Sequence, residues 1–340
     1  MFKRRNILAG ALGLPVAMSA LAAPALARDK TRWRMSNMYP RGVSFGVAYE
    51  AFARRIEQAT DGRLVIEMVY DGEGIGAAEI FSGVKSGLIE MGSPYMALHT
   101  GEMPSGVVQL GLPGGPERFD QLYTLLEHGG WKEILVEAYA SHGLAYIGSI
   151  MQPGVYVITK KPIQSLVDLN GLKLRAPGVY GAYLRAFGVA PVTMAFTEGY
   201  TSLATGVIDG AASSNLIDYR DGKWYEQAQN IYSSPLSGAQ VSPIIVHKAA
   251  YDGLPADIQL ILRQVQVSHC FDHVAISMLD VAAARAEMES GGAVFSAPPS
   301  PQDRLAMQTA TEAIWEQYAG ADDFSSRLIE AQRRFQAKIS

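Results

Sequence analysis

The sequence predicts an α/β protein with two lobes. The chain has 340 residues, more than the ~250–300 residues at which a single hydrophobic core usually stops growing. Strand-like and helix-like segments alternate with short connections, an order that favours right-handed crossovers and a mainly parallel sheet. Two stretches of similar order follow one another, as expected of two lobes that face a cleft.

The first residues have the features of a secretory signal peptide. Lys3, Arg4 and Arg5 form a positive start, residues 7–21 are mostly apolar, and residues 25–27 offer small side chains at a cleavage point. The Arg4-Arg5 pair resembles a twin-arginine export signal. Ile7 stands where Phe is commoner in that signal, so Sec export is the alternative. We therefore exclude residues 1–27 from the fold and expect a periplasmic protein.

The first unit of the mature chain has the order β-α-β-α-β. Residues 32–36 and 64–69 are strand-like. Between them, residues 47–59 have helical spacing, with Ala48, Phe52, Ile56 and Ala59 on one face. A glycine-rich turn over 71–76, a helix over 77–86 and a short strand after 87–91 complete this unit.

A second unit begins near Pro153 and repeats this alternation. Its expected strands are 155–159, 172–176, 190–194 and one reached through 207–212, and its expected helices are 165–169, 180–187 and 197–205. A strand over 241–247, a long helical tract over 255–289 and two amphipathic helices end the chain. We expect lobe I to comprise residues 28–152 and about 240–280, and lobe II to comprise residues 153–239 and about 281–340.

Composition and motifs exclude several classes of function. The 48% apolar and 18% charged residues rule out disorder, and no apolar run after the first thirty residues is long enough to span a membrane. The net charge of −4, which becomes −7 once Lys3, Arg4 and Arg5 are removed, comes with scattered positive residues and predicts no nucleic-acid partner. We find no catalytic constellation, and we expect no cofactor and no metal. His269 and His273 could share a metal at their i, i+4 spacing, but a buried Cys270 beside helix-face histidines is the favoured interpretation.

Residues 161–175, KPIQSLVDLNGLKLR, resemble the signature of the substrate-binding proteins of TRAP (tripartite ATP-independent periplasmic) transporters, the DctP-like family. Similar segments lie upstream and downstream at the family's spacing: 60–62, 84–92, 189–192, 200–203 and 206–210. The resemblance implies a periplasmic binding protein of type II-like fold, with mixed, mainly parallel sheets around a central cleft. It also implies that the lobes close around a small organic acid and deliver it to the membrane permease subunits.

Arg175 is the predicted anchor for this acid. It ends a strand-like run, and Ala176-Pro177-Gly178 immediately breaks the strand. Ligands of α/β folds bind at the carboxyl ends of strands, and a guanidinium can grip a carboxylate with two parallel hydrogen bonds. From these residues alone a structural ion pair is the commoner interpretation, whereas the resemblance favours ligand binding.

The sequence departs from the family pattern at two places. Many members that bind acidic substrates have a second arginine where this chain has Gly154-Val155-Tyr156, and many have a glutamate where residues 211–215 read AASSN. Fewer cationic groups suggest a monocarboxylate, and the missing glutamate argues against a ligand-linked metal ion. Ser213 aligns with a ligand-contacting polar position and Asn215 is a second candidate, although both could be turn formers.

Aromatic and amide side chains are the remaining candidates for ligand contact. A tyrosine supplies an apolar wall together with a hydroxyl donor, so these rings would suit an aromatic or branched ligand. Core packing is the alternative for each of them. The candidates are Tyr39, Phe45, Tyr95, Tyr156, Phe196 and, as an amide contact or hinge residue, Gln152.

The sequence is therefore compatible with two functions of different class. The first is a solute-binding protein that captures a 2-oxo or 2-hydroxy acid, or an aromatic or branched monocarboxylate, with Arg175 as the anchor. The second is an exported α/β enzyme that acts on an organic acid. Because the chain ends soon after Phe335, without the extended C-terminal helix through which some relatives dimerise, we expect a monomer.

Overall fold

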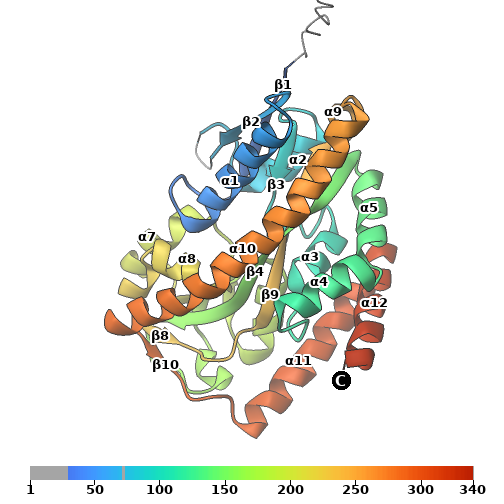
Figure 1. Cartoon of the computed structure of the whole chain (residues 1–340). Coiled ribbons are helices and arrows are strands. Elements are labelled where there is room, and N and C mark those ends of the chain that lie inside the picture. The colour runs from blue at the N-terminus through green and yellow to red at the C-terminus, as the bar shows by residue number, and fades with distance from the viewer. Residues whose placement is uncertain (1–29, 71–72, 340) are drawn as a thin grey trace, which may run out of the picture.

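The computed structural model describes residues 30–70 and 73–339 (Figure 1). The predicted signal peptide lies outside these residues. In the part described, no helix combines the length and the apolar character that a membrane crossing requires.

The predicted β-α-β-α-β order of the first unit is confirmed. Strand β1 pairs in parallel with both β2 and β3. The elements are β1 (Thr31–Asn37), α1 (Ser44–Ala59), β2 (Leu64–Val69), the 3₁₀ turn η1 (Ala77–Glu79), α2 (Ile80–Lys85) and β3 (Met91–Ser93). Helix α1 begins earlier than expected and buries Phe45, Tyr49, Phe52 and Ile56, so Ala48 and Ala59 are not on its buried face.

Four further helical segments follow β3, and none of them was expected from the sequence. They are η2 (Met96–Leu98), α3 (Pro104–Gly111), α4 (Phe119–His128) and α5 (Trp131–Ser141). We call β1–β3 and α1–α5 the first lobe.

Two long antiparallel strands connect the lobes. Strand β4 (Leu144–Thr159) pairs with β9 (Ser237–His247) along most of its length, and its last residues pair with β7 and β8 of the second unit. Pro153, where we predicted the second unit to begin, lies inside β4. The strands approach closely at Gly154, where an added Cβ would lie 2.2 Å from the carbonyl oxygen of Ser237. A side chain at this position would force the strands apart.

The second lobe repeats the parallel arrangement around β5. Strand β5 (Lys173–Arg175) pairs in parallel with β6 (Ala190–Val192) and β7 (Gly210–Ser214). We call β5–β7 and α6–α8 the second lobe. Its other elements are η3 (Leu166–Leu169), α6 (Gly178–Leu184), η4 (Arg185–Phe187), η5 (Phe196–Glu198), α7 (Gly199–Thr205), α8 (Leu216–Asp221), η6 (Trp224–Glu226) and β8 (Asn230–Ile231).

The predicted long helical tract is the single helix α10 (Ala256–Ser290), which runs along both lobes (Figure 1). An ion pair joins its first turn to the first lobe, with 2.6 Å between Asp257 and Arg63. Near its other end, Asp280 pairs with Arg220 of α8. Gln266 of α10 also donates a hydrogen bond of 2.6 Å to the backbone carbonyl of Ser149 in β4.

The remaining elements close the chain at the far side of the fold. They are α9 (Lys248–Asp252), β10 (Val294–Phe295), α11 (Pro301–Ala319) and α12 (Asp323–Ile339). Helix α12 packs against α3 and α5, and the indole of Trp131 donates a hydrogen bond of 2.8 Å to the carbonyl of Leu328. The lobe II tail expected over about 281–340 therefore contacts first-lobe helices. The residue limits of the two lobes stay a prediction.

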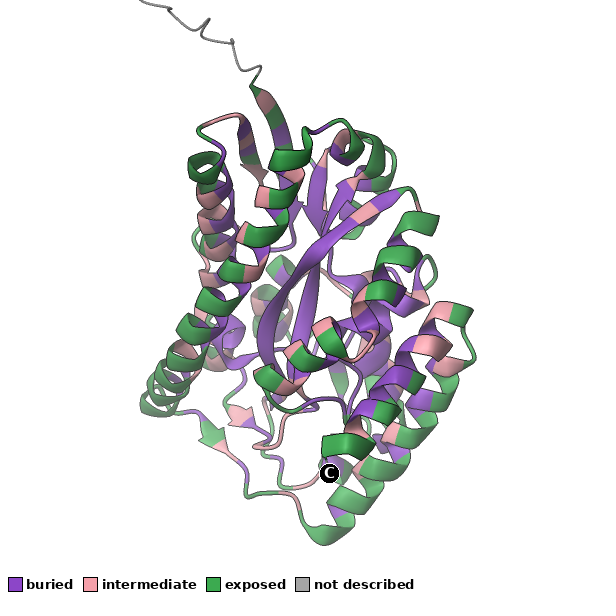
Figure 2. Cartoon of the chain, turned by 45° about the vertical axis from the view of Figure 1, so that its right-hand side comes forward, coloured by how far each residue is buried: buried purple, intermediate pink, exposed green. Residues whose placement is uncertain are grey.

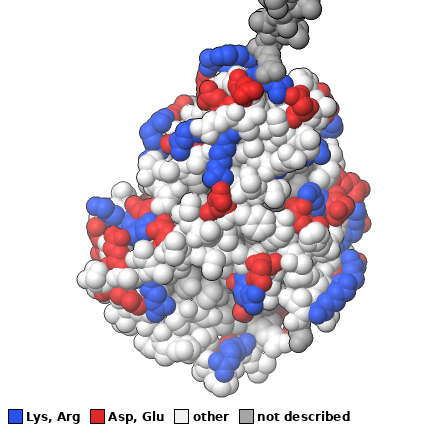
Figure 3. All heavy atoms as spheres, in the orientation of Figure 1, with Lys and Arg blue, Asp and Glu red and all other residues white. Residues whose placement is uncertain are grey.

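Burial and charge follow the layers of the fold. Figure 2 shows the buried residues concentrated in the central strands and on the inner sides of the helices. On the face drawn in Figure 3, basic and acidic side chains are interspersed and form no continuous basic stripe. The hydrophobic core extends through both lobes, so the polar groups buried between them stand out as candidates for function.

Candidate functional site

Arg175 lies at the carboxyl end of β5, as the sequence predicted, and is only 1% exposed. Its Nη1 group donates to the Ser213 hydroxyl, and its Nε group donates to the carbonyl of Met194 at 3.2 Å. These two bonds use only part of the guanidinium's N–H donors. Among the described residues, no carboxylate forms an ion pair with Arg175.

Burial lowers the pKa of Arg175 because the interior solvates its charge poorly, and the nearby Tyr95, Tyr219 and Asp218 partly offset this effect. A buried cation without an ion-pair partner is costly in free energy. A bound anion would therefore lower the free energy of this buried positive charge.

Contacts across the lobes show that the molecule is closed around Arg175. The hydroxyl of Tyr95, which follows β3, donates to the backbone carbonyl of Ser213 at 3.2 Å. The hydroxyl of Tyr180 in α6 donates to the carbonyl of Gly111 in α3 at 3.1 Å. Ser213 thus contacts Arg175 with its side chain and the first lobe with its backbone.

Aromatic rings from both lobes form one cluster beside the guanidinium. Tyr39 and Phe45 of the first lobe stack with their ring centroids 5.3 Å apart, and Tyr39 meets Phe196 of the second lobe edge-on at 5.9 Å. Phe196 stacks on Trp224 at 5.0 Å, and the Arg175 Cζ atom lies 5.5 Å from the Trp224 ring centroid. These rings therefore contact one another across the two lobes, beside the guanidinium of Arg175.

Gln152 belongs to the same cluster through Tyr39. The Tyr39 hydroxyl donates to Gln152 Oε1 at 3.3 Å, and Gln152 Nε2 donates to the Ser242 hydroxyl at 3.0 Å. Since Gln152 lies in β4 and Ser242 in β9, this chain of bonds ties the aromatic cluster to the strands that connect the lobes.

Asn215 is the N-cap residue of α8. Its Oδ1 atom accepts the backbone N–H of Asp218 at 3.0 Å, and its Nδ2 group donates to Asp218 Oδ2 at 3.0 Å. Asp218 is only 4% exposed. Burial, followed by the neighbouring Asp221, raises the pKa of Asp218 to about 8. Asn215 therefore positions a buried acid near Arg175, and its own contact with a ligand stays a prediction.

Tyr156 is the one predicted site residue that the structure does not bring to Arg175. Its ring borders a cavity of about 890 Å³ whose lining includes Tyr183, Met307 and Trp315 but not Arg175. Its backbone carbonyl accepts a hydrogen bond of 2.8 Å from Tyr219. The other predicted residues, namely Arg175, Ser213, Asn215, Gln152, Tyr95, Phe45, Tyr39 and Phe196, lie in one buried group.

Comparison with known protein families shows which family the chain belongs to. The model of the family described as bacterial extracellular solute-binding protein, family 7 (DctP), matches residues 35–321. The chain belongs to this family. It is therefore the extracytoplasmic solute-binding component of a TRAP transporter and not an enzyme.

Individual members of this family resemble the chain in sequence, and one of them also in fold. A monocarboxylate 2-oxoacid-binding periplasmic protein of Nostoc is 26% identical over 316 residues, which is 91% of this chain and 85% of the relative. The C4-dicarboxylate-binding protein DctP of Rhodobacter capsulatus is 27% identical over 265 residues, covering 75% of this chain and 76% of that protein. The crystal structure of a TRAP solute-binding protein from Pseudoalteromonas atlantica with sodium and pyruvate has a TM-score of 0.84 at 25% identity, covering 92% of this chain and 95% of the other.

Asn37, which was not among the predicted site residues, adjoins the candidate site through Tyr39. Asn37 ends β1, its Oδ1 atom accepts the backbone N–H of Tyr39 at 2.8 Å, and its buried Nδ2 group has no hydrogen-bond partner. The strand-end argument that selected Arg175 applies equally to Asn37 and could have found it. Tyr49 and Ser93 share a hydrogen bond of 2.6 Å in the adjoining first-lobe interior.

Two other members of this site gave no local signal. Asp218 and Trp224 lie in short helical segments without a motif, and only the packing of α8 and η6 places them beside Arg175.

The histidines of α10 are packing residues in this family 7 protein. The rings of His269 and His273 lie 6.4 Å apart and contact Phe52 and Phe45 of α1. Burial lowers the pKa of each histidine to about 4, so both are neutral at pH 7. In the part of the chain that the structure describes, there is no group of three or more His, Cys, Asp or Glu side chains that could hold a metal ion.

Proposed function

We propose that this family 7 protein captures a small organic monocarboxylate between its lobes and delivers it to the membrane permease of its transporter. The carboxylate would bind the remaining N–H donors of Arg175. The observation that supports this most is that the guanidinium is buried between the lobes, while no described carboxylate forms an ion pair with it.

The charge of the site favours one carboxylate over two. Arg175 is the only Lys or Arg side chain in the described part of the chain that is buried. A second carboxylate of a dicarboxylate would enter the closed interior without a cation of its own, which costs free energy. Asp218 would oppose it further whenever that group is ionised.

A 2-oxo or 2-hydroxy acid fits the remaining polar groups. The unpartnered Nδ2 group of Asn37 is a donor for a keto or hydroxyl oxygen, and an unpaired buried donor is costly until a ligand accepts its hydrogen bond. The aromatic cluster of Tyr39, Phe45, Phe196 and Trp224 supplies an apolar wall for the ligand body. The 2-oxoacid-binding relative from Nostoc and the pyruvate-bound protein from Pseudoalteromonas atlantica support this class of ligand.

The test is a thermal-shift and calorimetric comparison of pyruvate, lactate, 4-methyl-2-oxopentanoate and succinate. Bound ligand raises the melting temperature by mass action, so monocarboxylates should shift it and succinate should not. Mass spectrometry of acid retained through purification would identify the natural ligand independently.

Arg175→Ala is the decisive variant. It should weaken monocarboxylate binding roughly 100-fold or more, the scale of breaking a buried ion pair. The matched control is Arg32→Ala, which removes an exposed arginine that pairs with Glu67 at 2.6 Å on the surface. If Arg175→Ala retained wild-type affinity, or if succinate bound more tightly than every monocarboxylate, the proposal would be wrong.

A further inference from the structure

Helix α1 of the first lobe begins without a cap from its own segment. Val43 occupies the N-cap position and makes no side-chain cap, and no acidic residue lies in the first turn. Instead, Asp221 Oδ2 accepts the backbone N–H of Ser44 at 2.7 Å. The first N–H groups of a helix lack intrahelical acceptors, and a carboxylate beside them is stabilising. A carboxylate from α8 in the second lobe therefore caps a helix of the first lobe.

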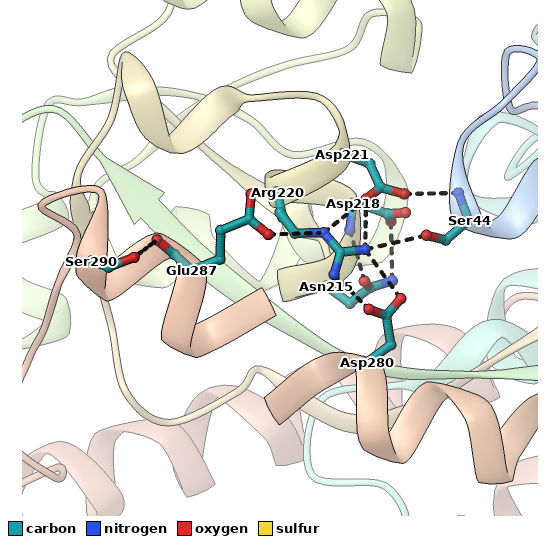
Figure 4. Close-up of polar contacts among 8 residues, drawn as sticks. All are labelled: Ser44, Asn215, Asp218, Arg220, Asp221, Asp280, Glu287 and Ser290. Carbon is teal, nitrogen blue, oxygen red and sulfur yellow. Dashed lines mark hydrogen bonds and ion pairs between the residues drawn. The ribbon is translucent and has the colours of Figure 1, made fainter. Parts of the chain in front are cut away.

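Arg220 holds this carboxylate in place (Figure 4). Its Nε and Nη2 groups donate to Asp221 Oδ1 at 2.9 and 2.7 Å, and Nη2 also donates to the Ser44 hydroxyl at 3.2 Å. Asp280 of α10 accepts from the same guanidinium, with 3.1 Å between Nη2 and Asp280 Oδ2. Hydrogen bonds to these two aspartates raise the pKa of Arg220.

The contact between Asp221 and the start of α1 is shielded from solvent, and most of its hydrogen bonds do not involve α1. The side chains of Arg220 and Asp221 are 15% and 14% exposed, so solvent screens their interaction less than that of a surface pair. The bonds between Arg220, Asp221 and Asp280 do not involve α1. Of the bonds in this contact, opening of the lobes would therefore break only those to Ser44, and it would leave the acceptor in position.

The same short helix also belongs to the site around Arg175. Asn215 caps α8 and Asp218 lies within one turn of Asp221, and both contribute to the buried group at Arg175. When α8 moves against α1, the groups that bury Arg175 and the hydrogen bond that caps α1 therefore change together.

We propose that Asp221 and Arg220 form an interlobe latch, in which Asp221 caps α1 only when the lobes are closed and thereby slows ligand release. This inference rests on the proposed function, because closure is the binding step. A contact present only in the closed state shifts the equilibrium toward that state and raises the affinity for any ligand that needs it. Loss of the latch should raise the ligand dissociation rate roughly 2- to 30-fold, the range that corresponds to the loss of a helix cap.

Two variants break the latch from opposite sides. Asp221→Ala removes the acceptor. Ser44→Pro removes the donor and leaves Asp221, Arg220 and Asp280 intact. Proline is well tolerated at the first position of a helix, and Val43, with φ −80° and ψ 156°, already has the extended conformation that a residue before proline requires. Each variant should accelerate dissociation of pyruvate in stopped-flow measurements, and their effects should not add in the double variant.

Asp252→Ala is the matched control. It removes an aspartate that pairs with Lys248 at 2.6 Å within the exposed helix α9, away from the interface between the lobes. This variant should dissociate pyruvate at the wild-type rate. Wild-type rates in both latch variants, or fully additive effects in the double variant, would overturn the inference.

A ligand-independent readout separates this inference from the proposed function. Spin labels on cysteines introduced at the exposed Gln58 of α1 and Ala204 of α7 report the distance between the lobes, because the native Cys270 is buried. Both latch variants should shift the ligand-free distances toward the open form, and Asp252→Ala should not. Failure of pyruvate, lactate and 4-methyl-2-oxopentanoate alike to bind the wild type would contradict the proposed ligand class, whereas unchanged distances in both variants would contradict the latch.

Discussion

The Cζ atom of Arg175 lies 5.5 Å from the centroid of the Trp224 ring, so the buried guanidinium rests beside an aromatic face of its own lobe. A cation–π contact of this kind compensates part of the free energy of removing the charge from water. The interaction does not use the N–H donors of the guanidinium. The charge is therefore stabilised without using the N–H donors that Ser213 and Met194 leave unused.

Gly199→Ala tests the packing that holds Trp224 in position. An added Cβ at Gly199 would lie 1.9 Å from the indole Cζ2 atom, so the ring would have to move. We expect a loss of about 1–3 kcal/mol in the free energy of unfolding, as for other overpacked sites, together with weaker ligand binding. Chemical denaturation and calorimetry measure the two effects. An unchanged affinity would show that the position of Trp224 does not matter to the ligand.

Asn37→Asp tests the unpartnered amide donor. The variant keeps the acceptor for the backbone N–H of Tyr39, but it replaces the buried Nδ2 donor with a second oxygen. A carboxylate there would repel an anionic ligand, so we expect affinity for 2-oxo acids to fall at least 10-fold, more than in Asn37→Ala. Asn170→Asp, at an exposed position, is the control. Equal affinity of Asn37→Asp and the wild type would exclude Asn37 from the ligand site.

The raised pKa of Asp218 should make the free energy of unfolding depend on pH. Its pKa is raised from 3.8 to about 8, chiefly by burial, so between these pH values the folded protein holds a proton that the unfolded chain has released. Stability from this group is therefore full below about pH 4 and is lost as the pH rises toward 8. Asp218→Asn should remove this slope in denaturation measurements from pH 5 to 8. The same slope in the variant would mean that another group causes it.

Gly178→Ala should hinder closure of the lobes. Gly178 has a φ of +57°, and an added Cβ would lie 2.7 Å from the carbonyl oxygen of Ala97 in the first lobe. Gly171→Ala is a matched control, because Gly171 has a φ of +79° with nothing within 4 Å of the added Cβ. Both variants should lose about 1 kcal/mol of stability through backbone strain. Only Gly178→Ala should also weaken ligand binding, and equal affinities would contradict a role in closure.

Local patterns predicted strands β1–β3 and β5–β7 and helices α1, α2, α6 and α7 of the two lobes, but not α3, α4, α5 or α8. The long periodic tract 255–289 became α10, and the break at Ala176-Pro177-Gly178 placed Arg175 at the end of β5. By contrast, β4 was expected only over 155–159, whereas it begins at Leu144 and contains Gly148, Pro153 and Gly154, residue types that are unfavourable inside a strand. The two glycines are tolerated because the register with β9 shifts between Tyr146 and Gly148 and because only glycine fits the close approach at position 154.

The sequence by itself determined the alternation of the elements, the family of the protein and the position of the predicted anchor Arg175 at the end of β5, since each depends on residues that are neighbours in the chain. The tertiary structure decided which groups surround that anchor. Trp224 and Asp218 reach it from different elements, and Tyr156 borders a cavity that Arg175 does not line although its position in the sequence favoured it. Packing between distant segments fixes such neighbours, because side-chain shape, burial and charge across the lobes leave no periodic trace in the local sequence.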